Sequence, residues 1–300
     1  MNNQNLEEAQ KVLPAGEDLG GAVVTIIGTG LIGGSMALAL KEKGFASKII
    51  GVENNAEHRQ QALDLGLVDE INELDEAIVK SDVIIIAVPV SVADKMITSI
   101  LDKADKQVII DVGSTKKSIC EAADKSKKRK RFVATHPMWG TEYSGPRAAV
   151  KGAFKNIAVI ICNKENSDDD ALLLTENMYR TLGMHLFYMK ADAHDLHAAY
   201  VSHISHITSF ALANTVLEKE REEDAIFEMA SAGFESTVRL AKSNPAMWVP
   251  IFMQNRENVL DVLNEHISQL RKFKSCLEKE NYDYLLELIE NANKIKRILK

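Results

Sequence analysis

Short apolar segments alternate with longer amphipathic ones from Val23 to about residue 190, and this alternation limits the possible folds most strongly. The apolar segments are rich in β-branched residues and lack polar alternation, as expected of strands buried on both faces of a sheet. Strand–helix alternation predicts right-handed βαβ crossovers and a mostly parallel sheet with helices on both faces. The expected strands are Val23–Ile27, Lys48–Val52, Val83–Ala87, Val108–Ile110, Phe132–Ala134, Ile157–Ile161 and Leu186–Tyr188.

The pattern changes near Ala191, and no later segment has the composition of a strand. Asn244 followed by Pro245 is typical of a helix start, with Asn as the cap and Pro at the first helical position. We therefore expect a polar tail over residues 1–20, an α/β domain over 21–190 and an all-helical domain over 191–300. The expected helices of the last domain cover residues 192–220, 234–242, 245–276 with a break, and 282–299.

The composition, with 46% hydrophobic and 26% charged residues, is that of an ordinary folded protein. Its 36 basic and 43 acidic side chains give a net charge of −7, which argues against nonspecific nucleic-acid binding. The three cysteines form no C-x-x-C pair, the first twenty residues do not resemble a signal peptide, and the longest apolar run is too short to span a bilayer. We expect a cytoplasmic protein without membrane or nucleic-acid partners.

A glycine-rich motif follows the first expected strand and opens the first expected helix. Its first glycine permits a tight turn, the second lets the backbone approach a pyrophosphate, and the third allows close helix–strand packing. The free N–H groups at the start of the helix then face the phosphates. This context predicts a Rossmann-type dinucleotide-binding domain, although a glycine turn that binds nothing is the alternative. The motif consists of Gly28, Thr29, Gly30, Leu31, Ile32 and Gly33.

An acidic residue, Glu53, stands twenty positions after Gly33, at the end of the second expected strand. A carboxylate there accepts hydrogen bonds from the adenosine ribose hydroxyls and repels a 2′-phosphate, so NAD is the predicted cofactor. Arg59 lies close enough in sequence to complicate this preference. Val88 and Pro89 follow a later strand and are expected to line the cofactor groove, unless the proline merely ends the strand.

Four further segments carry polar residues at positions suited to chemistry. Two follow strand ends, Asp111–Lys117 and Thr135–Glu142, and two lie in the helical part, Ser202–His206 and Gly233–Arg239. With the glycine motif, in this order and spacing, they resemble the prephenate/arogenate dehydrogenase family of tyrosine biosynthesis. The resemblance extends from about Val23 to past Asn258 and includes D-x-G-S-x-K, H-P-x-x-G-T-E and S-H-x-x-H.

The resemblance implies oxidative decarboxylation of prephenate to 4-hydroxyphenylpyruvate, with reduction of NAD, by a homodimer built through the helical domain. A neutral histidine suits the proton transfer, because its pKa lies near neutrality. By this resemblance His136 is the catalytic base and Ser114 orients it, while Arg239 binds a substrate carboxylate. His206, Ser202, Thr141 and Glu142 are matched to the substrate pocket, and Trp248 is expected to pack behind Arg239.

Several alternatives stay open. Glu235 replaces a basic residue of similar proteins, so arogenate is an alternative substrate. Another two-domain hydroxyacid dehydrogenase would need a lysine on the helical domain, and a non-catalytic NAD-binding regulator would not need His136. Among the histidines of residues 194–206, His203 and His206 share a helix face, but no H-E-x-x-H motif or cysteine partner accompanies them, so no metal site is predicted. The apolar stripe of residues 285–299 fits either a core or a dimer seam. We also expect a monofunctional enzyme, without a mutase-like segment before Val23.

Overall fold

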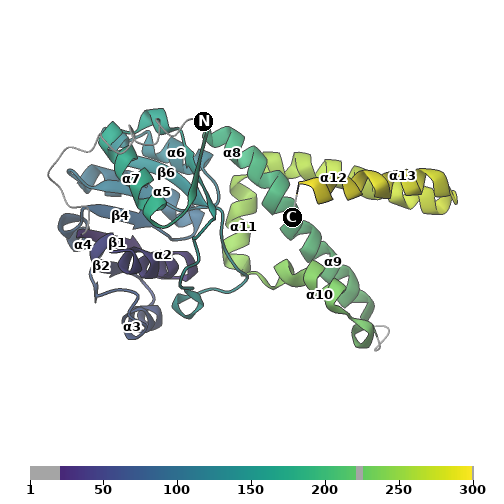
Figure 1. Cartoon of the computed structure of the whole chain (residues 1–300), viewed down its shortest axis with the longest axis horizontal. Coiled ribbons are helices and arrows are strands. Elements are labelled where there is room, and N and C mark those ends of the chain that lie inside the picture. Colours follow the sequence, from purple (N-terminus) through teal and green to yellow (C-terminus); the bar gives the residue numbers. More distant parts are fainter. Residues whose placement is uncertain (1–20, 221–225, 299–300) are drawn as a thin grey trace. The chain divides into compact units, whose positions relative to one another are not determined.

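A computed structural model describes residues 21–220 and 226–298 of the chain (Figure 1), so the predicted tail over residues 1–20 lies outside the described residues. The chain separates into two compact units, Met1–Met189 and Lys190–Lys300. The first unit is an α/β sandwich and the described part of the second is helical. The predicted fold class is therefore confirmed.

The first unit contains an eight-stranded sheet in the order β3-β2-β1-β4-β5-β6-β7-β8. Every neighbouring pair is parallel except β6 and β7. The strand order reverses between β1 and β4, which is where open α/β sheets bind their ligands. The strands are β1 Ala22–Ile27, β2 Ala46–Val52, β3 Glu70–Ile71, β4 Val83–Ile86, β5 Val108–Asp111, β6 Phe132–Pro137, β7 Ala158–Cys162 and β8 His185–Met189.

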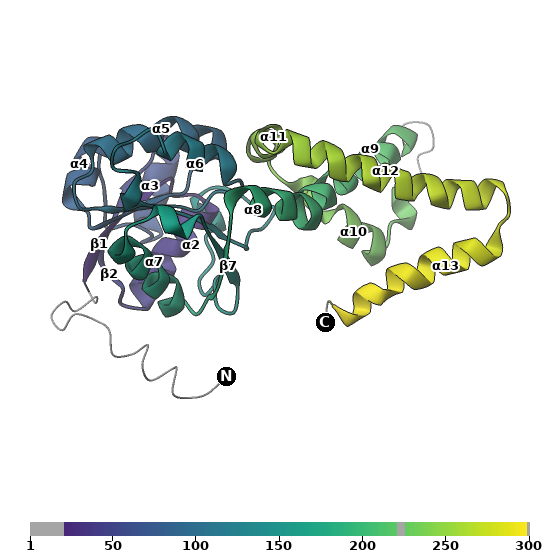
Figure 2. The same ribbon diagram turned by 90° about the horizontal axis from the view of Figure 1, so that it is seen from above.

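Helices cover both faces of this sheet, and Figure 2 shows α4, α5 and α6 together over one of them. On the other face, Met36 and Leu40 of α2 and Met178 and Tyr179 of α7 belong to one buried cluster with the strand side chains. The central strands β4 and β5 are buried on both faces, which explains their unbroken apolar composition. The helices are α2 Leu31–Glu42, α3 Ala56–Asp64, α4 Leu74–Lys80, α5 Val90–Lys103, α6 Lys117–Ala123 and α7 Asp169–Thr181.

The sheet differs from the sequence prediction at its two edges. β3 was not expected, because it has only two residues and one of them is the charged Glu70. β8 was expected, but its side chains are largely exposed, with Phe187 at 52%. Edge strands pair on one side only, so short or partly polar sequences suffice there and the apolar signal weakens.

In the second unit, the helix expected over residues 192–220 is broken by a π-helical turn, Ala199–His203. Asn244 caps α11 as predicted, accepting a hydrogen bond from the Ala246 amide at 2.9 Å, and Asn255 makes the expected break before α12. The α-helices are α8 Ala191–Ala198, α9 Ile204–Glu220, α10 Ala232–Val238, α11 Pro245–Gln254, α12 Arg256–Glu278 and α13 Tyr282–Asn293. Short 3₁₀ turns cover Phe227–Met229, Arg239–Lys242 and Lys294–Arg297.

The second unit buries little apolar surface by itself. One cluster of buried residues consists of Ala199, Val259 and Val262, with Ile204 and Ile207 packed against it. Among the described residues, Ala191, Ala198, Trp248, Ile251 and Cys276 are the other buried apolar side chains of this unit. No residue of α10 or α13 is buried, and many apolar side chains of the unit are exposed. Within residues 21–220 and 226–298, no helix combines the length and apolar character needed to cross a bilayer.

Candidate active site

The glycine motif forms the turn between β1 and α2. Gly28 has a φ of +91°, and a Cβ there would lie 2.7 Å from the Ala87 carbonyl oxygen. A Cβ on Gly33 would lie 2.0 Å from the Gly28 carbonyl oxygen, so both positions need glycine for packing. A Cβ on Gly30 would meet nothing within 4 Å. The backbone at Gly30 therefore borders open space, as a close approach to a pyrophosphate requires.

The same turn supplies backbone donors. Gly30 is the N-cap of α2, a twelve-residue helix, and its missing side chain cannot satisfy the first N–H groups. Leu31 and Ile32 continue the motif in the first helical turn, next to the fully buried Thr29. Free N–H groups and the positive end of the helix dipole attract phosphate. The residues present thus fit a dinucleotide.

Glu53 lies beside the glycine motif. Its Oε2 accepts hydrogen bonds from the backbone N–H (3.1 Å) and the hydroxyl (3.3 Å) of Thr29, and its Oε1 accepts from the Asn55 amide (3.0 Å). Arg59 donates to the backbone carbonyl of Glu53, and its guanidinium lies 3.4 Å from the Glu73 carboxylate. The Glu53 carboxylate is thus fixed beside the glycine turn, and the nearby arginine is engaged by acidic and carbonyl oxygens.

Val88 and Pro89 occupy the turn between β4 and α5, next to the strand-order reversal. A Cβ on Gly28 would lie 2.9 Å from the Val88 side chain, so Val88 contacts the glycine turn closely. Pro89 is exposed and forms the N-cap of α5. Both residues thus follow β4, the strand paired with β1, and Pro89 also ends the extended segment.

Ser114 follows β5, whereas His136 lies inside the neighbouring parallel strand β6, which extends beyond its predicted end at Ala134 to Pro137. Asp111, the last residue of β5, is aligned with Ala134 of β6. Ser114 and His136, which come shortly after these two residues, therefore lie near the same edge of the sheet. Ser114 is half-buried in the turn after β5. His136 is half-buried near the end of β6 and aligned with Ile160 of β7.

A buried ion pair that sequence reasoning missed lies between these two positions. Lys116 and Asp111 are 0% and 1% exposed, and the ammonium donates to the carboxylate and to the Thr135 carbonyl oxygen (2.6 Å). The same carboxylate accepts from the amides of Gly113 (3.0 Å) and Thr135 (3.2 Å). Burial raises the pKa of Asp111, and the Lys116 charge opposes that shift. The network fixes the backbone on either side of Ser114 and directly before His136.

Thr141 and Glu142 lie in the connection between β6 and β7, five and six residues after His136. Both are half-buried, and the Thr141 hydroxyl accepts a hydrogen bond from the Tyr143 amide at 3.3 Å. The neighbouring Tyr143 is 69% exposed. The segment is thus held by a local hydrogen bond at Thr141, and the side chain of Tyr143 is exposed to solvent.

In the helical unit, His206 stacks on Trp248 with ring centroids 3.4 Å apart. The stack joins α11, which carries Trp248, to α9, which carries His206. The Nδ1–H of His206 donates to the carbonyl oxygen of Ser202 at 3.1 Å, which leaves Nε2 as the acceptor of the neutral ring. Burial lowers the pKa of His206, and the positive charge of Arg239 acts in the same direction.

The π-helical turn turns His203 inward. The Asn255 side-chain amide donates to His203 Nδ1 (3.1 Å) and to the Asp195 carbonyl oxygen (2.6 Å), so the ring proton is on Nε2. That Nε2 is buried without a hydrogen-bond partner, and the ring meets Trp248 and Phe252 edge-on. Burial lowers the pKa of His203 to about 4. His203 therefore supports the aromatic cluster as a neutral ring.

Arg239 is exposed in the 3₁₀ turn after α10. The buried Ser209 holds this turn, because its hydroxyl donates to the Thr237 carbonyl oxygen and accepts from the Ala241 amide, both at 3.0 Å. These two partners flank Arg239 in sequence. Sequence reasoning missed Ser209, since a serine inside a helix carries no signal for a distant partner.

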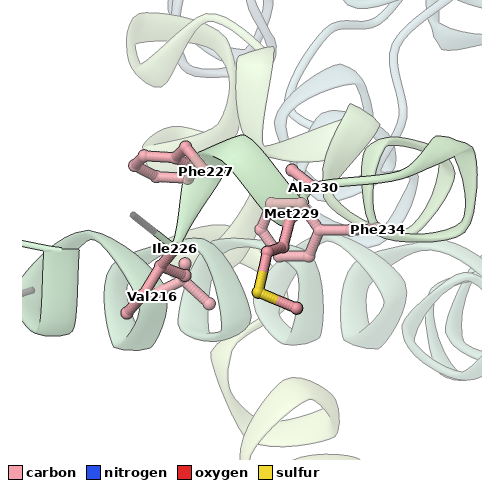
Figure 3. A pocket seen from close by; sticks show the side chains of 6 residues that line it. All are labelled: Val216, Ile226, Phe227, Met229, Ala230 and Phe234. Atoms are coloured by element: carbon pink, nitrogen blue, oxygen red, sulfur yellow. The ribbon is translucent and has the colours of Figure 1, made fainter. Parts of the chain in front are cut away.

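Two other findings restrict the site. Within residues 21–220 and 226–298, no group of three His, Cys, Asp or Glu side chains is arranged to hold a metal ion. Figure 3 shows a hollow between α9 and α10 whose lining is wholly apolar, so it offers no group for proton transfer. Its lining residues are Val216, Ile226, Phe227, Met229, Ala230 and Phe234.

Comparison with protein families decides the assignment. The model described as "Prephenate dehydrogenase, nucleotide-binding domain" matches residues 36–188, and "Prephenate dehydrogenase, dimerization domain" matches residues 190–291. The chain belongs to the prephenate dehydrogenase family. The resemblance drawn from the motifs is thereby confirmed.

Individual proteins support the same assignment. A prephenate dehydrogenase of Bacillus subtilis is 30% identical over 90% of this chain and 74% of its own length. A cyclohexadienyl dehydrogenase of Zymomonas mobilis is 29% identical over 92% of this chain and 96% of its own. The crystal structure of Aquifex aeolicus prephenate dehydrogenase with hydroxyphenyl propionate and NAD⁺ has a TM-score of 0.85 and 29% identity, covering 95% of this chain and 99% of that one.

The glycine geometry predicts that one glycine-to-alanine substitution lowers stability and another weakens NAD binding. Gly33→Ala should lower the melting temperature, because its Cβ would lie 2.0 Å from a backbone oxygen. Gly30→Ala should leave the melting temperature nearly unchanged, yet weaken NAD binding about tenfold or more by placing a methyl group where the pyrophosphate approaches. Thermal unfolding and calorimetric titration with NAD measure the two effects. Unchanged NAD affinity in Gly30→Ala would place the dinucleotide elsewhere.

The depressed pKa of His203 predicts a pH-dependent stability. Between pH ~6.5 and ~4 the unfolded chain binds this proton and the folded protein does not, so the free energy of unfolding falls as the pH decreases. The slope from this group is at most about 1.4 kcal/mol per pH unit. His203→Phe should reduce it, whereas His197→Gln, which removes an exposed histidine of α8, should leave it in place. Urea unfolding at pH 7, 6 and 5 makes the comparison, and equal slopes in His203→Phe and the wild type would contradict it.

Proposed function

We propose that this protein is an NAD-dependent prephenate dehydrogenase of tyrosine biosynthesis. One observation carries the proposal beyond family membership: the glycine turn after β1, Ser114 after β5 and His136 near the end of β6 lie at the carboxyl ends of mutually parallel strands. The carboxyl ends of these strands lie along one edge, so a nucleotide and a proton acceptor share that edge. A protein that only binds NAD has no need of such an acceptor.

The chemistry needs few protein groups. Prephenate carries a ring hydroxyl and two carboxylates, and loss of the ring carboxylate as carbon dioxide restores aromaticity. His136 accepts the hydroxyl proton, and Ser114 hydrogen-bonds the same hydroxyl and orients the imidazole. NAD, when bound, accepts the hydride from the carbon that bears this hydroxyl. The remaining task of the protein is to orient the ring.

The helical unit supplies groups for the substrate's carboxylates. Arg239 offers a guanidinium from a backbone turn that Ser209 holds, and the stacked His206 presents Nε2 one helical turn after Ser202. Thr141 and Glu142, which follow β6, are two further proposed substrate-binding residues. Arogenate stays the alternative substrate, because Glu235 offers a carboxylate that would suit its ammonium group, although Lys242 lies 3.7 Å from it. Oxidation assays with each compound distinguish the two.

The Glu53 geometry predicts the cofactor preference. NAD should support turnover far better than NADP, because the carboxylate beside Thr29 repels a 2′-phosphate and Arg59 is paired with Glu73. Glu53→Ala should lower kcat/KM with NAD and so reduce the difference between the two cofactors. The ratio of kcat/KM values for the two cofactors measures this preference. Equal efficiency in the unmutated protein would overturn the assignment of NAD.

The proposed roles of His136 and Arg239 separate in kinetics. His136→Asn should lower kcat about a hundredfold or more with little change in KM, the usual scale for loss of a general base. Arg239→Ala should raise the KM for prephenate tens- to a thousandfold, as expected for losing a charged partner worth about 2–5 kcal/mol. Formation of NADH gives both parameters. A stable His136→Asn protein with near-normal kcat would remove His136 from the mechanism.

We also propose a cytoplasmic homodimer formed through the helical unit, since that unit leaves large apolar side chains of α12 and α13 exposed. Cys120, Cys162 and Cys276 are buried thiols, which suits a reducing compartment. Sedimentation should give twice the 33.2 kDa chain mass. Leu270→Asp should shift the protein toward monomer, whereas Val79→Asp, on the exposed face of α4, should not. A monomeric wild type would contradict the dimer.

A further inference from the structure

The connection between β6 and β7 leaves the sheet directly after His136 and returns across the nucleotide-binding elements. We name residues 138–150 of this connection the strap. Thr141 and Glu142 lie near its start, next to the exposed Tyr143. Its far end lies against α2, the helix that begins with the glycine motif, because the Val150 amide donates to the Ser35 hydroxyl at 2.9 Å.

Ser35 joins the strap to the first turn of α2. Its side chain is fully buried, and its hydroxyl donates to the Leu31 carbonyl oxygen at 2.6 Å while it accepts from the Val150 amide. Leu31 is the first residue of α2, immediately after the Gly30 cap. One hydroxyl thus connects the helix turn that faces the phosphates with the segment that carries Glu142.

Two glycines allow the strap to lie this close. A Cβ on Gly34 would lie 3.0 Å from the Ala149 Cβ and 3.0 Å from a Leu67 methyl carbon, so Gly34 keeps space for the strap. Gly34 follows the dinucleotide motif, and the motif's own requirements do not explain it. Gly145 has a φ of +83°, and a Cβ there would be 3.5 Å from His58 of α3. The strap therefore contacts both helices that flank the predicted ribose and phosphate positions.

We propose that Ser35 is a positioning residue for substrate binding. Through the Val150 amide it fixes the position of the strap, which carries Thr141 and Glu142, relative to the glycine turn when NAD is bound there. Binding of NAD to the first turn of α2 then orders the strap and favours the substrate, and by linkage the substrate favours NAD equally. The kinetic part of this inference rests on the proposed function. The link between NAD and the strap does not.

The structure offers variants on both sides of the contact. Ser35→Ala removes the hydroxyl, and Val150→Pro removes the amide donor without changing α2. Ala149 already has φ −59° and ψ +133°, the conformation favoured before proline, and the Val150 side chain is 41% exposed. Thr175→Ala is the matched control, because this buried hydroxyl of α7 likewise donates to the carbonyl four residues earlier, at 2.8 Å.

Steady-state kinetics test the positioning role. Ser35→Ala and Val150→Pro should each raise the KM for prephenate about two- to tenfold, the range that one neutral hydrogen bond supports, with kcat nearly unchanged. The double variant should be no worse than either single variant, because both changes break the same bond. Thr175→Ala should leave the KM unchanged. Independent, multiplying effects of the two substitutions, or an unchanged KM in both, would overturn the inference.

Hydrogen exchange tests the same link without any substrate. Addition of NAD to the full-length wild type should slow exchange of the strap amides, and Ser35→Ala should abolish this slowing while calorimetry still shows NAD binding. Strap protection that persists in Ser35→Ala overturns the inference whatever the substrate is. If prephenate is not oxidised but the NAD-dependent protection behaves as expected, the proposed function fails and the link between NAD and the strap stands.

Discussion

The buried pair of Asp111 and Lys116 is the interaction on which the proposed catalytic edge depends. Transfer of both charges out of water costs several kcal/mol for each ion, and removal of one partner from such a pair typically costs about 3–5 kcal/mol. Here the cost is offset because backbone groups complete the coordination: two amides donate to the carboxylate and the Thr135 carbonyl accepts from the ammonium. A further chain runs from the Thr135 hydroxyl to that of the buried Tyr179 at 2.6 Å.

This arrangement explains why Lys116 belongs in the same motif as Ser114. The Lys116 ammonium binds the carbonyl of Thr135, the residue before His136, as well as the Asp111 carboxylate. One ion pair therefore fixes the backbone next to both Ser114 and His136. If Ser114 and His136 were flexible, ordering them on binding would cost conformational entropy. Held in place, they are already arranged for the substrate hydroxyl. The pair therefore contributes through geometry, at some expense of stability.

Local sequence was sufficient wherever one element determines its own structure. The apolar strands, the glycine turn and the Asn244 cap each follow from adjacent residues, and the structure has them. It was insufficient wherever a residue acts through a distant partner. Ser209, Asn255 and Lys116 are ordinary polar residues until folding brings them to a carbonyl, an imidazole or a carboxylate. The stack of Trp248 on His206 joins two helices and left no trace in the spacing of either.

The π-helical turn at Ala199–His203 absorbs one residue of chain without disturbing the helix on either side. Such a turn holds one residue more than an α-helical turn, whereas an extra residue in a regular helix would rotate everything after it by about 100°. Because the wide turn takes up that residue, α9 continues nearly in the register of α8, and His206 and Ser209 keep their places beside Trp248 and the Arg239 turn. Deletion of one residue here would restore a regular α-helical turn without rotating α9, but it would change which side chain occupies the place of His203. Homologous sequences should therefore tolerate a gap of one residue in this turn.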